Sequence, residues 1–203
     1  MIAQSKSMVE PYKSLEQQRF EQYQMEELIM HGVCVSNLAY LIAEELGCDK
    51  AFCETMAMTG VVHDIGKVKV YNYLYGDEDK DTLTVEKLHY IRMHSQLGYD
   101  ILKQEEFEED ILQAVLYHHE NYDGSGYPEN LSGEDIPLSA RILRVCDVFA
   151  ALISDRTYRK AFDVETAIEL MIDEVKNFDM QIFLAFMRVI HNVDINKITG
   201  KDE

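Results

Sequence analysis

Apolar residues recur at every third or fourth position over much of this chain, which is the spacing of one face of an α-helix. One stripe consists of Cys34, Leu38, Leu41 and Ile42. Gly47 follows it, and a glycine just past such a stripe is typical of a helix C-terminal cap. The pattern therefore predicts a helix that ends close to Gly47.

Two later segments show the same spacing. Asp163 is predicted to cap the start of the first, because an aspartate side chain accepts hydrogen bonds from the unpaired amides there. The first stripe is Val164, Ala167, Ile168, Met171, Ile172 and Val175, and the second is Ile182, Phe183, Phe186, Met187 and Ile190. No segment shows the clear alternation of a β-strand. We therefore expect an all-α protein.

Turn-forming residues predict two loops. Residues 71–82 are rich in Asp, Gly and Tyr, and residues 121–137 contain the run DGSG with Pro128 and Pro137. At the N-terminus, we expect residues 1–15 to be a flexible or linker-like segment. Residues 16–203 then form one domain of ordinary size.

The chain is strongly acidic, with a formal net charge of −18 over 203 residues. Such a surface disfavours polymeric nucleic acid and anionic membranes, because both reward clustered Lys and Arg. The simplest interpretation of the acidity is a solvated surface. A small phosphate ligand stays compatible with it, since bound divalent metals would reverse the local field.

The cysteines favour a reducing compartment. Cys34, Cys48, Cys53 and Cys146 form no CxxC pair and fall within apolar helical patterns, so we expect reduced thiols. No apolar run approaches the roughly 18 residues of a membrane span, and the polar N-terminus lacks the apolar stretch of a signal peptide. The expected location is the cytoplasm.

Candidate chemistry lies in histidines and aspartates. His63 and Asp64 are adjacent, His118 and His119 are adjacent, and His94 lies on an apolar stripe. Asp147 lies inside a predicted buried helix. A buried carboxylate costs roughly several kcal/mol unless a positive group meets it. A shared divalent metal would satisfy these side chains, and an aspartate can bridge two metals. Mixed nitrogen and oxygen ligation fits iron, manganese, zinc or nickel.

The residues alone leave an alternative open. A lone inward-facing histidine is more often a satisfied core residue than a ligand, and an His-Asp dipeptide occurs often by chance. When the two adjacent pairs are considered together with His94 and Asp147, a metal site and an ordinary buried core explain the pattern equally well.

A longer pattern resembles a known family. The chain reads His63-Asp64-Ile-Gly-Lys67, then His94, then HHENYDGSGYP from His118 to Pro128, then Asp147 and Arg156-Thr-Tyr-Arg159. This pattern resembles the HD-GYP subgroup of the HD phosphohydrolases from about residue 27 to about residue 183. The resemblance implies an all-α HD-domain bundle of about five to seven helices around a di- or trinuclear metal site.

The resemblance also implies roles for individual residues. The expected metal ligands are Glu27, His31, His63, Asp64, His94, His118, His119 and Asp147. Asp64 would bridge metals, and Lys67 would stabilise charge on the reacting phosphate or protonate the leaving oxygen. Tyr127, Arg156 and Arg159 would contact substrate, with the arginines at the second phosphate.

Glu27 is the least specific of these ligands. Glu27 and His31 are four residues apart, so a helix places both on one face. His31 matches the first histidine of the family pattern, and Glu27 matches a glutamate of the members with a third metal. A surface charge is the alternative for Glu27.

Two features depart from the family pattern. Ala150 stands where a second aspartate is frequent, so a carboxylate that would orient a ligand is missing. The loop at residues 68–83 is longer than usual, lacks a Lys-Pro pair and contains three tyrosines beside Asp77, Glu78 and Asp79. An acidic lip disfavours a dianionic substrate, whereas the tyrosines could stack on guanine.

The expected activity is hydrolysis of a cyclic dinucleotide, first of all cyclic di-GMP, to linear dinucleotide or GMP. Two or three divalent metals would be the cofactors, iron or manganese before zinc or nickel. The alternatives are an HD phosphohydrolase acting on another nucleotide and a catalytically silent binding module in second-messenger signalling. The sequence leaves open whether the protein partner is a second copy of this chain, in a homodimer, or a signalling protein.

Overall fold

The structure is a computed structural model that describes residues 15–74, 85–155 and 159–200. These residues form ten α-helices, two short 3-10 helices and no β-strand, which confirms the all-α expectation. The helices outnumber the expected five to seven because several are short. They are α1 (Leu15–Glu45), α2 (Lys50–Val62), α3 (Lys67–Leu74), α4 (Val85–Arg92), α5 (His94–Gln104), α6 (Glu109–Tyr117), α7 (Leu138–Leu152), α8 (Val164–Asp173), α9 (Met180–Asn192) and α10 (Ile195–Thr199).

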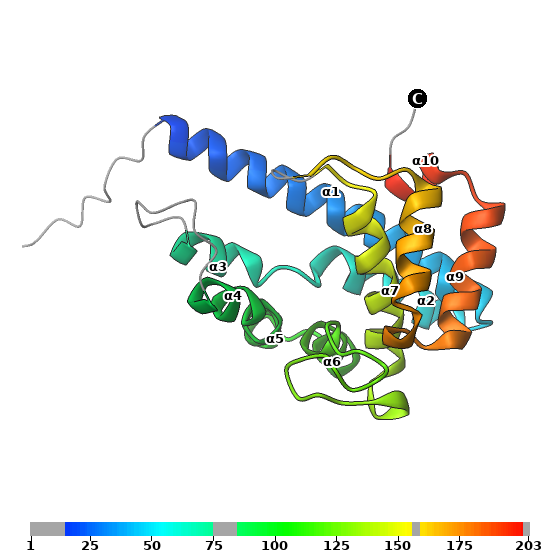
Figure 1. The fold of residues 1–203 in the computed structure, drawn as a ribbon. Helices are drawn as coiled ribbons and strands as arrows, with labels where there is room; N and C mark the ends of the chain where they lie inside the picture. The colour runs from blue at the N-terminus through cyan, green and yellow to red at the C-terminus, as the bar shows by residue number, and fades with distance from the viewer. Residues whose placement is uncertain (1–14, 75–84, 156–158, 201–203) are drawn as a thin grey trace, which may run out of the picture.

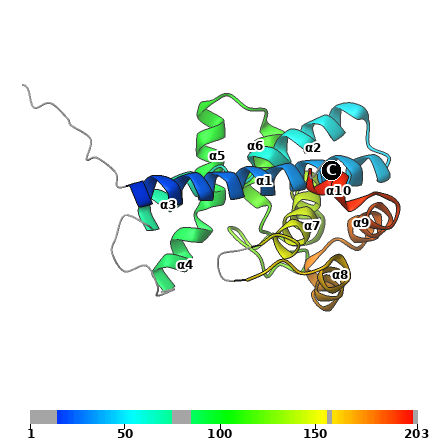
Figure 2. The ribbon, with the colours of Figure 1, turned by 90° about the horizontal axis from the view of Figure 1, so that it is seen from above.

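Helix α1 is the long axis around which the other helices pack (Figure 1). It contacts α2, α7, α9 and α10. Seen from above, α2, α5 and α6 lie on one side of α1, whereas α7, α8 and α9 lie on the other (Figure 2). Helix α6 joins the two sides, because it contacts α2 and α5 as well as α7.

The main hydrophobic core lies where α1, α2, α7 and α9 meet. Leu38 and Met56 are fully buried in it, and the rings of Phe149 and Phe186 lie 5.0 Å apart. Helices α1 and α2 approach so closely at Gly60 that a Cβ atom there would lie 2.5 Å from the Cα of Ser36. This close packing brings the end of α2 against the middle of α1.

Aspartate caps start several helices. The side chain of Asp163 accepts a hydrogen bond from the amide of Thr166, so the predicted cap of α8 is confirmed. Asp49, Asp179 and Asp194 cap α2, α9 and α10 in the same way. The predicted end of the first helix is also confirmed, because α1 ends at Glu45 and Gly47 has a φ of 79°.

The loop predictions fare differently. Residues 121–137 contain no α-helix and only the 3-10 turn at Gly133–Asp135, as predicted. The loop predicted at residues 71–82 is wrong for residues 71–74, because α3 continues to Leu74. Lys67-Val-Lys-Val-Tyr contains no helix breaker, so the backbone stays helical past the expected boundary. The rest of that loop and nearly all of the predicted N-terminal segment lie outside the described residues.

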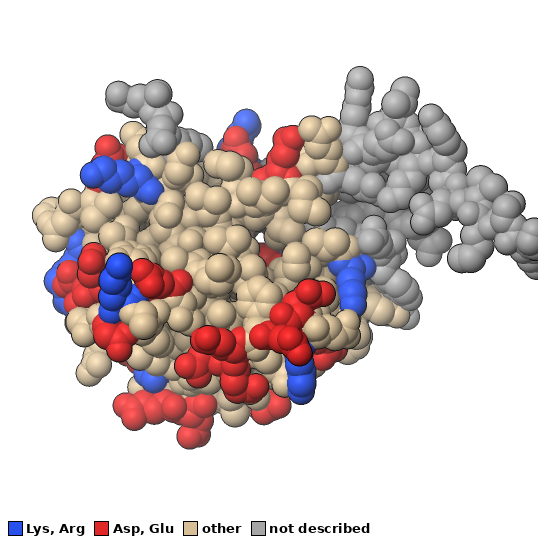
Figure 3. All heavy atoms as spheres, turned by 180° about the vertical axis from the view of Figure 1, so that it is seen from behind, with Lys and Arg blue, Asp and Glu red and all other residues tan. Residues whose placement is uncertain are grey.

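Acidic side chains dominate part of the surface. On the face in Figure 3 they gather along the lower edge, whereas the centre carries neither acidic nor basic side chains. None of the helices in the described ranges is both long and apolar enough to cross a bilayer.

Candidate metal centre

Five helices bring the predicted histidines and aspartates together in the interior. His31 comes from α1, His94 begins α5, and Asp147 comes from α7. The pairs His63-Asp64 and His118-His119 directly follow α2 and α6. The potential ligand atoms form two groups, each with all its atoms within 4.8 Å of one another. The first is Asp64, His94, His118 and His119, and the second is His31, His63, Asp64 and Asp147.

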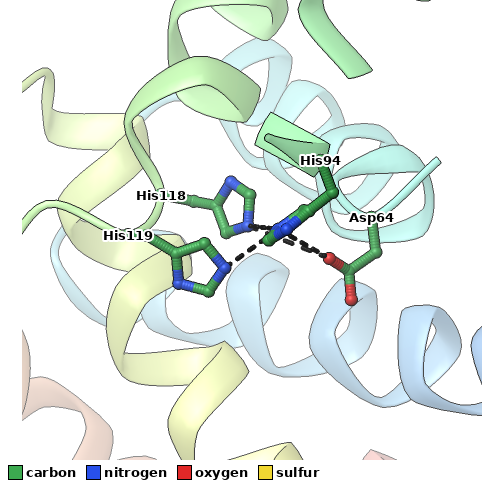
Figure 4. A group of neighbouring side chains, drawn as sticks. All are labelled: Asp64, His94, His118 and His119. Atoms are coloured by element: carbon green, nitrogen blue, oxygen red, sulfur yellow. Dashed lines mark hydrogen bonds and ion pairs between the residues drawn. The ribbon is translucent and has the colours of Figure 1, made fainter. Parts of the chain in front are cut away.

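Asp64 belongs to both groups, and its two oxygens face different partners. Oδ1 lies 3.3 Å from Nε2 of His94 (Figure 4). Oδ2 lies 3.3 Å from Nε2 of His63 and 3.7 Å from Nε2 of His31. A carboxylate with one oxygen in each of two adjacent ligand sets has the geometry of a bridge between two metals.

Three of the histidines are oriented by the same local hydrogen bond. The Nδ1 atom of each donates to the backbone carbonyl three residues earlier, namely His63 to Gly60 (2.8 Å), His94 to Ile91 (2.5 Å) and His118 to Val115 (2.7 Å). Because a carbonyl oxygen can only accept, Nδ1 carries the proton and the lone pair is on Nε2. These bonds therefore aim the three Nε2 atoms into the cluster.

Several buried polar atoms lack a hydrogen-bond partner among the residues that the structure describes. Nε2 of His63 and Oδ1 of Asp64 are among them. Nε2 of His94 lies 3.2 Å from Nε2 of His118 and 3.0 Å from Nε2 of His119 (Figure 4). Because Nδ1 of His94 and Nδ1 of His118 already donate, their Nε2 lone pairs face each other and repel unless a cation lies between them. The donor set therefore fits divalent metal ions, and its imidazole and carboxylate chemistry suits first-row metals.

The protonation states also suit metal binding. Burial and the neighbouring His63 and His94 lower the pKa of His118 to about 3, so its imidazole is neutral at pH 7. Burial would raise the pKa of Asp64, but Lys67 and His63 hold that pKa well below its usual range. Burial lowers the pKa of His63, yet the carboxylates of Asp64 and Asp147 raise it to about 10. His63 therefore binds a second proton at pH 7 when no metal is present, and a bound metal would take the place of that proton.

Lys67 lies beside the carboxylate of Asp64. Its ammonium group forms an ion pair with Oδ2 of Asp64, and its side chain stays about one fifth exposed. The preceding Gly66 makes this position possible, because a Cβ atom there would lie 1.9 Å from the carbonyl oxygen of His94. The turn after Asp64 thus packs directly on the start of α5 and leaves Lys67 at the rim of the cluster.

Tyr127 covers the His119 side of the cluster. Its ring stacks on the ring of His119, with 4.8 Å between centroids and 27° between planes. The amide of Tyr127 donates to the carbonyl of His119, at 3.2 Å. The loop is also tied at its far end, because buried Glu120 accepts a hydrogen bond of 2.7 Å from the amide of Glu129. These contacts place Tyr127 beside the predicted ligands.

The other predicted residues lie elsewhere. Glu27 is one turn before His31 on α1 and lines, with it, a hollow of about 290 Å³. Glu27 is in neither ligand group. The guanidinium of Arg159 caps the end of α7 by donating to the carbonyls of Ala151 and Leu152. It also donates to the carbonyl of Lys160 and lies over the ring of Phe162. Arg156 lies outside the described residues.

The position of His94 on an apolar stripe is confirmed as inward-facing, since the residue is buried. The chain turns at Met93, and His94 begins α5. Packing of α5 on Gly66 and α6 favours this break. Ala150, the family departure, is fully buried in the hydrophobic core.

Sequence reasoning missed two arginines near the cluster. Arg92 lies 5.2 Å from the ring centroid of Tyr127, and Arg144 lies one turn before Asp147 on α7. The signal that could have found them is their spacing, two residues before His94 and three before Asp147. Glu120 stood in the quoted motif but received no role.

Comparison with known proteins supports the resemblance. The sequence model described as "HD domain" matches residues 3–182. The chain is 38% identical over 136 residues to the cyclic di-GMP phosphodiesterase response regulator RpfG of Xanthomonas campestris, which covers 66% of this chain and 35% of that protein. It is 35% identical over 162 residues to the cyclic di-GMP phosphodiesterase PA4108 of Pseudomonas aeruginosa, covering 79% of this chain and 39% of that protein.

Further similarities point the same way. The chain is 32% identical over 160 residues to the 3′3′-cGAMP-specific phosphodiesterase 1 of Vibrio cholerae, covering 78% of this chain and 37% of that protein. The fold resembles an HDG"Y"P protein from Bdellovibrio bacteriovorus, with a TM-score of 0.66, 22% identity and coverage of 81% of this chain and 53% of that one. The chain therefore spans between a third and two fifths of the length of these curated relatives.

Proposed function

This chain belongs to the HD domain family, and from that premise we propose that it is a metal-dependent phosphodiesterase that hydrolyses a cyclic dinucleotide. Cyclic di-GMP is the first candidate, because RpfG and PA4108 are named for it. The product would be linear dinucleotide or GMP. The observation that carries the proposal is Asp64, whose two oxygens face two buried ligand sets.

We assign the metal ligands as His31, His63, Asp64, His94, His118, His119 and Asp147, with Glu27 as the ligand of a third ion. Bound divalent ions would supply Lewis acidity, which lowers the pKa of water and neutralises phosphate charge. The mixed nitrogen and oxygen donors favour iron or manganese, with zinc and nickel as alternatives.

The remaining residues act on the substrate. Lys67 extends from the cluster rim, where its ammonium group can meet negative charge that develops on the phosphate or on the leaving oxygen. Tyr127, which stacks on His119, would contact the substrate beside the cluster. The sequence predicts Arg156 and Arg159 for the second phosphate, although the guanidinium of Arg159 donates to backbone carbonyls of the protein. The catalytic domain would be residues 16–203.

The four cysteines are free thiols, which supports a cytoplasmic location as part of the proposal. A homodimer or a signalling protein as partner remains a prediction of the sequence. Because the curated relatives are much longer than this chain, its activity is proposed for this domain.

The test is turnover of cyclic di-GMP by protein purified without oxygen and supplied separately with Fe(II) or Mn(II). The metal content is measured on the same sample. We expect hydrolysis by the parent and none by Asp64→Ala, because that change removes a ligand from both groups at once. Asp110→Ala on α6, outside both groups, is the matched control and should retain turnover.

Two results would count against the proposal. Metal-loaded parent that hydrolyses neither cyclic di-GMP nor the mixed and adenine dinucleotides would favour a silent binding module. Undiminished turnover by Asp64→Ala would place the chemistry elsewhere on the protein.

A further inference from the structure

A cyclic dinucleotide carries two phosphodiester groups, and only one of them can react at the metal centre at a time. The other stays negatively charged, and in a chain with a net charge of −18 it needs a local cation. The guanidinium of Arg159 already donates to two backbone carbonyls at the end of α7 and to the carbonyl of Lys160. A cation for the second phosphate must therefore be another guanidinium group near the metal centre, one whose donors are not all used.

Arg92 is such a residue. It ends α4, is exposed, and lies over the ring of Tyr127 with 5.2 Å between its Cζ and the ring centroid. The same ring stacks on His119, so Arg92 contacts a residue that itself contacts a predicted metal ligand. Among the described residues, no carboxylate forms an ion pair with Arg92, so its charge is available to an anion.

Arg144 approaches from α7. It is three residues before Asp147, so the two side chains share a face of that helix. Its Nε donates to the side-chain oxygen of Asn121 at 2.9 Å, which fixes the guanidinium beside the loop that carries Tyr127. Its charge acts on both Tyr127 and His119. In the described part of the chain, the two terminal nitrogens of Arg144 have no hydrogen-bond partner.

We propose that Arg92 and Arg144 form, beside Tyr127, the subsite that binds the non-reacting phosphate of the cyclic dinucleotide. This inference rests on the proposed function and deepens it. Guanidinium groups suit the role because they present several donors in the plane that a phosphate accepts. One arginine comes from α4 and the other from α7, so two helices would supply the subsite beside Tyr127.

The test compares a substrate that has two phosphates with one that has a single phosphate. For the parent, Arg92→Gln, Arg144→Gln and the double variant, KM and kcat are measured with cyclic di-GMP and with bis(4-nitrophenyl) phosphate. Each single variant should raise the KM for cyclic di-GMP about 10-fold, and the double variant about 100-fold, with kcat nearly unchanged. Hydrolysis of bis(4-nitrophenyl) phosphate should stay at the parent rate in all of them.

Arg188→Gln is the matched control, because it removes one exposed guanidinium that pairs with Glu45 away from the cluster. Cyclic di-AMP, measured as an inhibitor of bis(4-nitrophenyl) phosphate hydrolysis, separates phosphate binding from base recognition. Since both cyclic dinucleotides share one backbone, the variants should weaken both to the same extent.

Several outcomes would overturn the inference. An equal loss of activity with the single-phosphate substrate would mean that the arginines support the metal centre itself. A loss confined to one cyclic dinucleotide would assign them to base recognition. Turnover of cyclic di-GMP with the parent KM in both single variants would refute this subsite and leave the proposed function standing. A parent protein that neither hydrolyses nor binds cyclic di-GMP would contradict both the arginine subsite and the proposed function.

Discussion

Asp64 and Lys67 show how two side chains one turn apart can divide the work of the site. Asp64 is buried, at 2% exposure, and both of its oxygens face predicted ligands. Lys67 is held against Asp64 but reaches the rim, where a substrate phosphate would arrive. We therefore propose the carboxylate as a metal ligand and the ammonium group as the one that acts on the substrate.

Replacing Lys67 should separate these two roles. Lys67→Ala should keep its metal, because every member of the two ligand groups remains. It should lose about 10²-fold in kcat or more, the typical loss when one charge-stabilising donor is removed. Metal analysis and steady-state kinetics on one sample measure both effects.

Lys69→Ala is the matched control for that prediction, because Lys69 lies two residues further along, is exposed and should affect neither quantity. Parent-like kcat in Lys67→Ala would exclude this lysine from the chemistry.

At the scale of elements, the starts of helices are joined to one another by side chains. Asp179 caps α9 by accepting from the amide of Gln181, and its other oxygen pairs with Arg141 of α7. Arg141 also donates to the carbonyl of Ile136, just before α7. One buried carboxylate thus fixes the loop that follows the DGSGYP motif, α7 and α9 relative to one another.

Removing that carboxylate should destabilise the fold measurably. Asp179→Ala should lower the free energy of unfolding by about 3 kcal/mol, because it removes a helix cap and leaves the guanidinium of Arg141 mostly buried and without its carboxylate. Urea unfolding followed by circular dichroism gives the value.

Asp49→Ala is the appropriate comparison for Asp179→Ala, since it removes only the cap of α2 and should cost about 1 kcal/mol. Equal losses for the two variants would show that the ion pair with Arg141 contributes nothing beyond the cap.

At the scale of the whole molecule, the metal centre joins helices from both sides of α1. Its predicted ligands come from α1, α5 and α7 and from the residues that follow α2 and α6. Without a cation, the cluster holds carboxylates and imidazole lone pairs in close contact. A metal that binds only the folded chain should therefore stabilise the entire helical assembly.

Metal removal should lower the thermal midpoint by about 5–10 °C. A free metal concentration of about 100 Kd adds roughly 2.7 kcal/mol, and about 1 kcal/mol shifts Tm by about 2–4 °C in a domain of this size. Differential scanning calorimetry with and without a chelator measures the shift. The chelator should shift the thermal midpoint of Asp64→Ala much less. Equal midpoints for the metal-loaded and the chelator-treated parent protein would contradict the prediction.

The sequence by itself determined the features that depend on local spacing. Apolar stripes and aspartate caps predicted α8 and the end of α1, because a helix start or end is decided within a few residues. The motifs also predicted the histidines and aspartates that meet in the interior, since each pair or single residue is recognisable in its own segment.

Only the tertiary structure decided how these segments face one another. The turn at Met93 that starts α5 with His94 follows from packing against Gly66, which local periodicity does not encode. The capping role of Arg159 and the positions of Arg92 and Arg144 beside Tyr127 depend on residues distant in the chain or on loop geometry. Long-range packing therefore decides that the guanidinium group of Arg159 is bonded to backbone carbonyls, whereas those of Arg92 and Arg144 lie beside the proposed substrate site.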